Sequence, residues 1–381
     1  MPEEAVPDAL PLRLIAVMVL THTAFTSMRL ALTLAVLQQG GSALAVGVIV
    51  SLLMVVPVFS SIAIGRWTDR AGHVPAALAG LALIVVGGLV ATRQVLPALA
   101  CGAVLIGSGQ AMVQVAIMDA IGQGGGEGAA RRFSALSLGF SVSGFFGPIL
   151  TGLAIDHAGH ALAFFTLCLP ASAAWLLALR SAPAAARAPA TAPRGTAGAL
   201  WADPRLRAVL LVTALLAMAW DLFTFVMPVH GTRLGLSATA IGTVAGSFAA
   251  GCFSIRLVLG RLAARLGERR ILWGALTGTA MCYALFPLAG GLPAMAVLAY
   301  VIGLFLGSGQ PMAMSLLHRS APAGRSGEVM GVRTVIVSIS QTALPLVFGA
   351  LGAALGTGPV FLAVAAAMGS GMAWVRRSSP R

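Results

Sequence analysis

Charged residues are scarce in this chain. They make up 9% of the 381 residues, whereas hydrophobic residues make up 58% and the mean hydropathy is +0.94. A soluble domain carries about 25% charged residues, which help to cover its surface. This composition excludes a soluble protein and predicts an integral membrane protein.

Residues that carry enzyme chemistry are also missing. The chain has no lysine, so it has no phosphate-binding Gly-x-x-x-x-Gly-Lys loop, and no nucleophile motif is present. The cysteines lack metal-ligand spacing and lie in apolar runs, which favours small buried side chains. They are Cys101, Cys168, Cys252 and Cys282. We therefore expect no enzyme activity, no metal and no cofactor, and any transport would use an ion or substrate gradient.

Long apolar runs fill the chain. The acidic first eleven residues do not resemble a signal peptide, so we expect the first run to be a retained helix. Helices of about 20 residues cross a bilayer. Twelve runs fit: 12–36, 44–64, 75–93, 97–118, 134–155, 160–180, 207–229, 238–259, 271–290, 294–317, 328–353 and 358–375. The sequence thus predicts an all-α membrane protein with six-helix bundles at 1–180 and 207–381, joined by a cytoplasmic linker at 181–206.

The arginines indicate the orientation of these spans. With the N-terminus inside, 19 of the 24 arginines fall in cytoplasmic segments, and only Arg93 and Arg233 fall outside. This asymmetry predicts that both termini are cytoplasmic, in a bacterial inner membrane. It also explains most of the +13 net charge, so we expect no nucleic-acid partner.

Two segments of the first half recur in the second. Residues 65–73 (GRWTDRAGH) return 195 positions later as 260–268 (GRLAARLGE), and 107–112 (GSGQAM) return 200 positions later as 307–312 (GSGQPM). The second pair predicts that Gln110 and Gln310 occupy equivalent positions. Two similar membrane halves can enclose a substrate and rock to open either side.

The loop Gly65-x-x-x-Asp69-Arg70-x-Gly72 resembles the loop motif of the major facilitator superfamily. The weaker second copy, the twelve spans and the linker agree with that resemblance. It implies a gating loop in which Asp69 and Arg70 latch one conformation, with Asp119 as a further partner. The glycines would permit a tight turn. The alternative is that these charges are solvated and only set the topology.

The sequence departs from this family pattern. His73 stands where the family usually has Arg, and Ala264 stands where the second copy could have an acid. Both departures would weaken the charge network of the loops.

The fifth span is similar to the glycine-proline motif of drug and metabolite antiporters in this family. Its motif residues are Gly144, Gly147, Pro148 and Gly152. Ser143 and Thr151 depart from the motif, and Ala103 replaces an arginine that many proton-coupled exporters carry in the fourth span. Pro148 would kink the helix, while the glycines would allow close packing; a generic kinked helix is the alternative.

Ionisable residues within the spans are the main candidates for substrate binding and coupling, because burying a charge in the bilayer is costly. They are Arg29, Asp221, Arg256, Arg333 and His22. Arg256 could instead extend to the interface, His22 could be a packing residue, and Asp221 could form a structural pair with an arginine. Neighbouring candidates for substrate contact are Gln110, Gln310, Gln341 and Trp220.

The sequence therefore predicts a secondary transporter, expected to be a monomer, that moves a small organic molecule by alternating access. Proton-coupled export is favoured, with Asp221 as the proton carrier. The alternative is uptake or exchange of a small organic anion. Three buried arginines outnumber one deep carboxylate, which leaves the core with a net positive charge. A membrane sensor without transport activity would need an added domain or a long tail.

Overall fold

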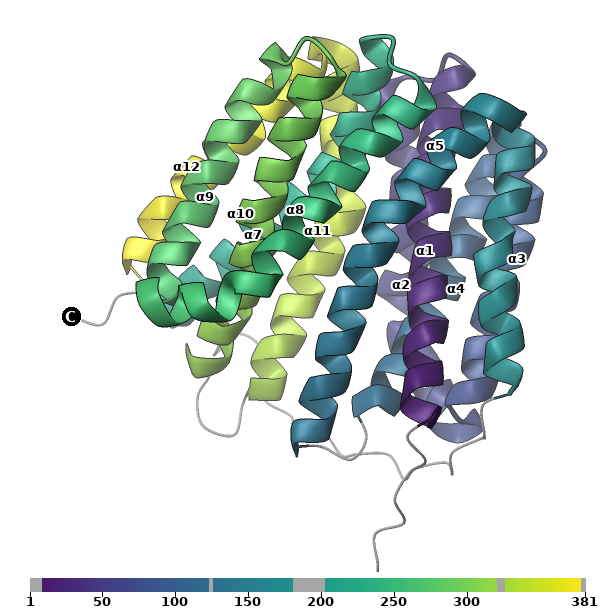
Figure 1. Ribbon diagram of the computed structural model, residues 1–381, viewed down its shortest axis with the longest axis horizontal. Helices are drawn as coiled ribbons and strands as arrows, with labels where there is room; N and C mark the ends of the chain where they lie inside the picture. Colours follow the sequence, from purple (N-terminus) through teal and green to yellow (C-terminus); the bar gives the residue numbers. More distant parts are fainter. Residues whose placement is uncertain (1–8, 123–125, 181–202, 321–325, 378–381) are drawn as a thin grey trace, which may run out of the picture. The chain divides into compact units, whose positions relative to one another are not determined.

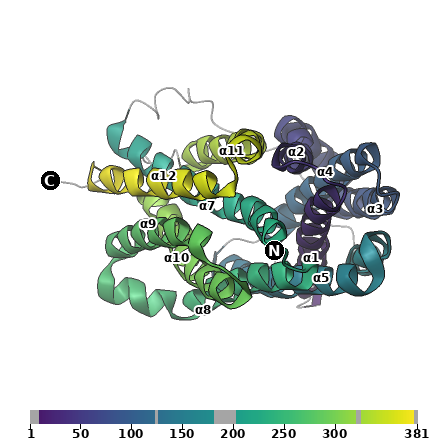
Figure 2. The same cartoon turned by 90° about the horizontal axis from the view of Figure 1, so that it is seen from above.

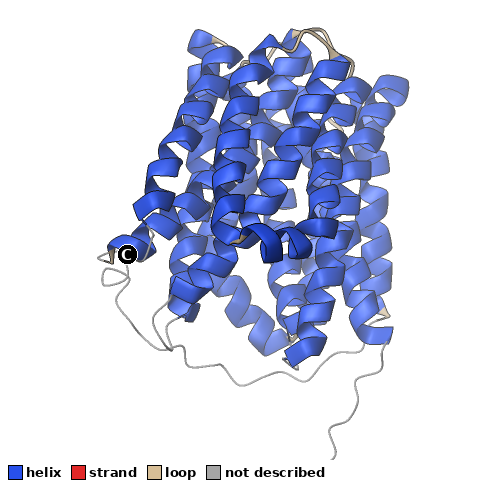
Figure 3. Ribbon diagram, turned by 60° about the vertical axis from the view of Figure 1, so that its left-hand side comes forward, coloured by secondary structure: helices blue, strands red, loops and turns tan. Residues whose placement is uncertain are grey.

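The computed structural model describes residues 9–122, 126–180, 203–320 and 326–377. These residues are almost entirely helical and include no strand (Figure 3), which confirms the all-α prediction. The helices are α1 (Ala9–Gln38), α2 (Ala43–Ala71), α3 (His73–Ala91), α4 (Leu96–Gly122), α5 (Gly126–Leu179), α7 (Pro204–Arg233), α8 (Ala238–Leu266), α9 (Glu268–Leu285), α10 (Leu292–Ser320), α11 (Ser326–Leu355) and α12 (Thr357–Arg377), with a short 3-10 helix at Phe286–Leu288.

The described helices account for the twelve predicted spans. Ten are long and apolar enough to cross a membrane, and the apolar part of α12 is shorter, at Thr357–Met372. The apolar part of α5 is 45 residues long, enough for two crossings, and it is interrupted at Gly159, whose φ is 76°. The fifth and sixth spans therefore lie on either side of Gly159.

The chain forms two compact units. One contains residues 1–36 and 52–191, and the other contains residues 37–51 and 192–381. The start of α2, residues 43–51, thus belongs with the second unit. Close packing on α11 explains this: a Cβ on Gly47 would overlap the Pro345 carbonyl oxygen, and the Ser51 hydroxyl donates to the Thr342 carbonyl at 2.7 Å.

In the first unit, glycines bring α3 and α4 into close contact. A Cβ on Gly80 would lie 2.6 Å from the Gly109 carbonyl oxygen, and one on Gly87 would lie 2.9 Å from that of Gly102. Gly107 of α4 faces α2 in the same way, because a Cβ there would overlap the carbonyl oxygen of Leu53. Small residues allow this approach, which maximises van der Waals contact where no hydrophobic effect drives association.

In the second unit, α7 packs against α8, α10, α11 and α12, while α9 packs against α10 and α12 (Figures 1 and 2). Aromatic rings fill the space around α7. Phe223 contacts the rings of Phe248, Tyr283 and Phe286 at centroid distances of 4.8, 6.4 and 5.6 Å. Phe223 is 0% exposed, so it belongs to the core of this unit.

The turns of the two halves of the sequence confirm the repeat of 195 residues. Gly40 and Gly235 both have a positive φ, of 75° and 74°, and so do Gly72 and Gly267, of 87° and 75°. Few other residues adopt this backbone conformation readily. The local turn geometry therefore recurs with the sequence.

The prediction that Gln110 and Gln310 are equivalent is wrong. Counted from Leu96 and Leu292, where α4 and α10 begin, Gly107 and Gly303 are both the twelfth residue. Both also make the same contact, since a Cβ on Gly303 would overlap the Phe248 carbonyl oxygen of α8. The GSGQ segment of α10 therefore lies one helical turn further along, and the counterpart of Gln310 is Gln114.

Candidate functional site

In the predicted gating loop, the turn contains one of the two glycines, Gly72. Gly72 precedes α3 with φ 87° and ψ 164°, a conformation that favours glycine. Gly65 lies inside α2, and a Cβ there would meet no atom within 4 Å, so its predicted role in the turn is wrong. Arg70 is exposed beside Gly72. The side chains of Asp69 and Asp119 lie outside what the structure describes.

The second loop has a defined ion pair. Glu268, the first residue of α9, accepts hydrogen bonds from Ser315 at 2.9 Å and from the guanidinium of Arg319, both on α10. A carboxylate at a helix N-terminus is also stabilised by the helix dipole. Residue 264 is alanine where the second copy of the loop could have an acid. Glu268 instead provides the acidic side chain of this loop. Its counterpart in the first loop, His73, is buried at the start of α3.

The fifth-span motif packs against α1. A Cβ on Gly147 would lie 2.9 Å from the Ser27 hydroxyl oxygen, and the Ser143 hydroxyl donates to the Val19 carbonyl at 3.0 Å and accepts from Thr23 at 2.8 Å. Ser143 stands where the motif commonly has glycine, and it joins α5 to α1 through hydrogen bonds. The other motif residues are Gly144, which is half-buried, and Pro148 and Gly152, which are buried. The helix continues through Pro148 and is interrupted only at Gly159.

Helix α1 carries His22 and Arg29 seven residues apart, which places them on one face two turns from each other. Both are half-buried. The His22 ring lies 4.4 Å from that of Phe140 on α5, at an angle of 37°. Its Nδ1 atom is buried without a hydrogen-bond partner among the described residues. His22 therefore packs against α5 while keeping one polar atom unused.

Asp221 lies in the interior of α7 and is 7% exposed. Among the acidic side chains that the structure describes, it is the only buried one. The hydroxyl of Thr224 donates to the Asp221 backbone carbonyl at 2.8 Å. Trp220 is half-buried and meets Phe248 edge to face at 4.8 Å.

The remaining predicted residues lie on α4, α8, α10 and α11. Arg256 on α8 is half-buried and lies about one helical turn after Cys252. Arg333 on α11 is half-buried, and its Nε has no hydrogen-bond partner among the described residues. Gln310 and Gln341 are half-buried, whereas Gln110 is 7% exposed. The described contacts do not gather these residues into one cluster within either unit.

Sequence reasoning missed a polar contact at the end of α7. The Nδ1 atom of His230 lies 2.8 Å from the hydroxyl of Thr357 at the start of α12, and Arg233 donates to the Gly352 carbonyl at 3.0 Å. These contacts hold α7 to the α11–α12 turn. The pairing of His230 and Arg233 one turn apart was visible in the sequence, but their partners lie more than 100 residues away.

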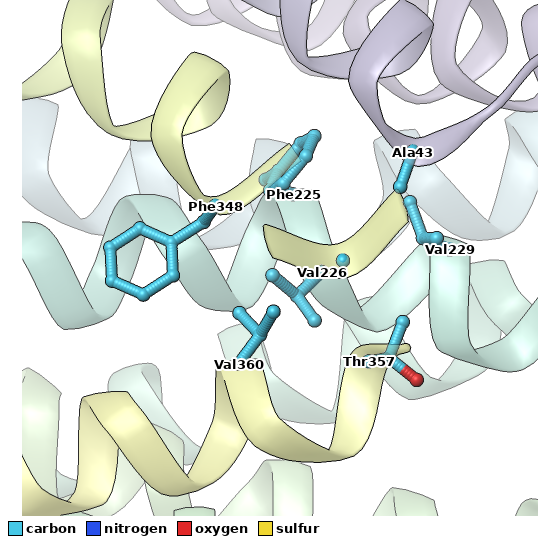
Figure 4. Close-up of a pocket in the computed structure, with 8 residues that line it drawn as sticks. Ala43, Phe225, Val226, Val229, Phe348, Thr357 and Val360 are labelled. Carbon is cyan, nitrogen blue, oxygen red and sulfur yellow. The ribbon is translucent and has the colours of Figure 1, made fainter. Parts of the chain in front are cut away.

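A narrow crevice lies beside this contact (Figure 4). It is too tight for a water molecule and has an apolar lining. Its residues are Ala43, Phe225, Val226, Val229, Phe348, Gly352, Thr357 and Val360. No predicted substrate or coupling residue lines it, so this crevice is not the candidate site.

Comparison with known proteins agrees with this fold. Residues 14–340 and 209–381 match the family model described as Major Facilitator Superfamily. An uncharacterized MFS-type transporter of Bacillus subtilis, YuxJ, is 24% identical over 239 residues, which cover 58% of this chain and 59% of that protein. The tetracenomycin C resistance and export protein of Streptomyces glaucescens is 26% identical over 171 residues, 45% of this chain and 31% of that protein. The matches thus span less than two thirds of either relative.

Solved transporter structures share the fold at low sequence identity. The nucleoside transporter NupG has a TM-score of 0.80 at 13% identity and covers 97% of this chain and 100% of its own. A D-xylose–proton symporter has a TM-score of 0.76 at 12% identity and covers 98% of both chains. The peptide transporter POT has a TM-score of 0.77 at 14% identity, covering 99% and 96%. The family match over most of the chain shows that this membrane protein belongs to the major facilitator superfamily, and the fold agrees with that family.

Proposed function

We propose that this transporter exports a small organic molecule across the bacterial inner membrane in exchange for protons, with Asp221 as the proton carrier. The burial of Asp221 in the interior of α7 carries the proposal. A carboxyl group held away from water within a membrane span is costly as a fixed charge. The carboxyl group can be protonated and neutral while it is buried, and it can release its proton and become charged when it is exposed to water. Proton binding can therefore be coupled to a conformational change.

The distant relative named for tetracenomycin C export supports the outward direction. The partial glycine-proline motif of α5 supports it as well, because Gly147 and Ser143 form a close seam with α1. In this proposal Trp220, beside Asp221 and half-buried, offers an aromatic surface to the substrate. The loop at residues 65–72 latches one conformation of the cycle.

Exchange of a small organic anion is the second candidate. Arg29, Arg256 and Arg333 are half-buried within membrane spans, whereas Asp221 is the one buried acid among the described side chains. The excess positive charge suits a carboxylate or phosphate, and a guanidinium can bind either through two parallel hydrogen bonds. An anion exchanger would need no proton.

Flux measurements distinguish the two candidates. A thermal-shift screen of the purified protein against metabolites and drugs, with tetracenomycin C among the first probes, identifies a ligand. Proteoliposomes are then loaded with that ligand, with and without an imposed proton gradient. Acceleration by the gradient, abolished by a protonophore, supports export coupled to protons. Ligand exchange that is indifferent to the gradient favours the anion exchanger.

We expect accessibility labelling to place both termini in the cytoplasm, because the arginine asymmetry requires that orientation. Cys101 is exposed and should first be replaced by alanine, while the other cysteines are buried. Single cysteines at Arg187 and Arg377 should react only from the cytoplasmic side, and one at Gly235 only from the periplasmic side. Labelling of the Arg187 position from outside would contradict the topology.

We expect Asp69→Asn to reduce transport about tenfold at normal expression, because a charge-assisted hydrogen bond contributes about 1.5–3 kcal/mol. The substitution keeps the size of the side chain and removes its charge. The loss should appear in turnover rather than in substrate affinity, since the loop acts on conformational exchange. Asp156→Asn, the same change at an exposed position, is the control. Wild-type turnover in Asp69→Asn would favour solvated charges.

A further inference from the structure

Helix α8 has a packed face and an exposed apolar face. The packed face meets α10, since a Cβ on Gly303 would overlap the backbone carbonyl oxygen of Phe248. A Cβ on Gly307 would likewise lie 2.8 Å from the Cα of Cys252. Leu257 is nine residues after Phe248, about two and a half helical turns, so it lies on the opposite face. Its side chain is 62% exposed.

Two arginines continue the exposed face towards the end of α8. Arg261 follows Leu257 by four residues and Val258 by three, so the three side chains lie on one face. Arg265 follows Arg261 by four more residues. Val258 is 46% exposed, and both arginines are exposed. An apolar strip that ends in cations matches the profile of a bilayer, whose hydrocarbon core is followed by polar headgroups.

Helix α9 adds two more arginines beside the turn at Gly267. Arg269 and Arg270 are exposed in its first turn, and Trp273, one turn later, is half-buried. Tryptophan is enriched where membrane and water meet. Glu268 is the only acid in α8 and α9, and it already accepts hydrogen bonds from two side chains of α10. We call the four arginines at 261, 265, 269 and 270 the basic surface.

Local helix energetics do not account for the basic surface. Arg261 and Arg265 are like charges four residues apart, an arrangement that destabilises a helix. Arg269 and Arg270 lie at the positive end of the α9 dipole, which disfavours cations, and only Arg265, in the last turn of α8, is favoured by a dipole. The repeat does not require them either, because valine and proline stand 195 positions earlier, at residues 74–75. A bound anion would offset these costs.

We propose that the basic surface binds the headgroup of an anionic phospholipid, whose acyl chains lie against Leu257 and Val258. A guanidinium holds a phosphate through two parallel hydrogen bonds. Clustered arginines beside a membrane span attract anionic lipids, and this attraction falls off within a Debye length. The apolar strip favours a lipid over free phosphate, because only a lipid contacts both the strip and the arginines. This inference is independent of Asp221 and of the direction of transport.

Fluorescence quenching in liposomes tests lipid binding at this position. Cys101→Ala removes the exposed cysteine, and Leu257→Cys supplies a new one for a fluorescent label. The full-length protein is placed in phosphatidylcholine with a rising fraction of phosphatidylglycerol that carries brominated acyl chains. A second series uses brominated phosphatidylcholine. We expect phosphatidylglycerol to quench at the lower fraction, and added salt to reduce this preference. Equal quenching by the two lipids, or quenching by neither, overturns the proposal.

Arginine variants then locate the binding. We expect Arg261→Gln combined with Arg265→Gln to reduce the preference several-fold, and by at most about thirtyfold, since each arginine near an anionic surface contributes about fivefold. Both positions are exposed, so the fold should persist. Arg187→Gln combined with Arg194→Gln removes the same charge from the segment 181–206 and should leave the preference unchanged.

An unchanged preference in the α8 variant, or an equal loss in the control variant, overturns the basic surface as the binding site. Inorganic phosphate distinguishes a lipid from a free anion. Added at the concentration of the lipid headgroups, with chloride at the same ionic strength as reference, it should not restore the fluorescence. Full restoration by phosphate would mean that the arginines bind a free anion, and would overturn the assignment to a lipid.

Discussion

Asp221→Asn is expected to abolish proton-driven transport while substrate exchange continues at close to the wild-type rate. Asparagine matches aspartate in size and can hydrogen-bond, but it cannot bind and release a proton. Because Asp221 is buried in α7, the change leaves the surface charge of the protein unaltered. Ligand efflux from proteoliposomes under an imposed proton gradient measures the first quantity, and counterflow without a gradient measures the second.

Asp156→Asn, which alters an exposed acid, should preserve both activities. Unchanged proton-driven efflux in Asp221→Asn would eliminate Asp221 as the carrier and leave His22, or an anion exchange that needs no proton. Arg29→Lys then separates these alternatives. If Arg29 binds an anionic substrate, lysine should weaken that binding because it lacks the bidentate guanidinium.

Gly107→Ala is expected to cause the largest loss of stability among single methyl additions in the first unit. The new Cβ would overlap the backbone carbonyl oxygen of Leu53, so α2 and α4 would have to separate. Backbone atoms cannot rotate away as a flexible side chain can, and overpacking of this kind costs about 1–3 kcal/mol or more. The yield of folded protein and its thermal unfolding in detergent measure the effect.

Gly274→Ala on α9 is the matched control. A Cβ there meets no atom within 4 Å, and alanine favours a helix over glycine by about 1 kcal/mol. We expect this variant to unfold at or above the wild-type temperature. Equal stability of Gly107→Ala and Gly274→Ala would mean that α2 and α4 are not held at the close approach described here.

The membrane class, the twelve spans and the family follow from the sequence, because each rests on local properties of the chain. Apolar runs of about 20 residues cross a bilayer whatever their neighbours are. Gly72 and Gly267 were recognisable from the repeat, since both precede a helix with a positive φ that few other residues adopt. Asp221 could be selected because a carboxylate inside an apolar run is rare.

Tertiary structure alone decided which residues meet. The repeated GSGQ segment suggested that Gln110 and Gln310 are equivalent, but contacts with α2 and α8 show that Gly107 corresponds to Gly303. A slip of one turn nearly preserves the helical face and the apolar pattern, so sequence comparison does not detect it. The hydroxyl of Tyr283 reaches Ala219 across 64 positions of the chain, and Glu268 reaches Arg319 across 51. Such contacts depend on how helices pack, which the spacing of residues along one helix does not specify.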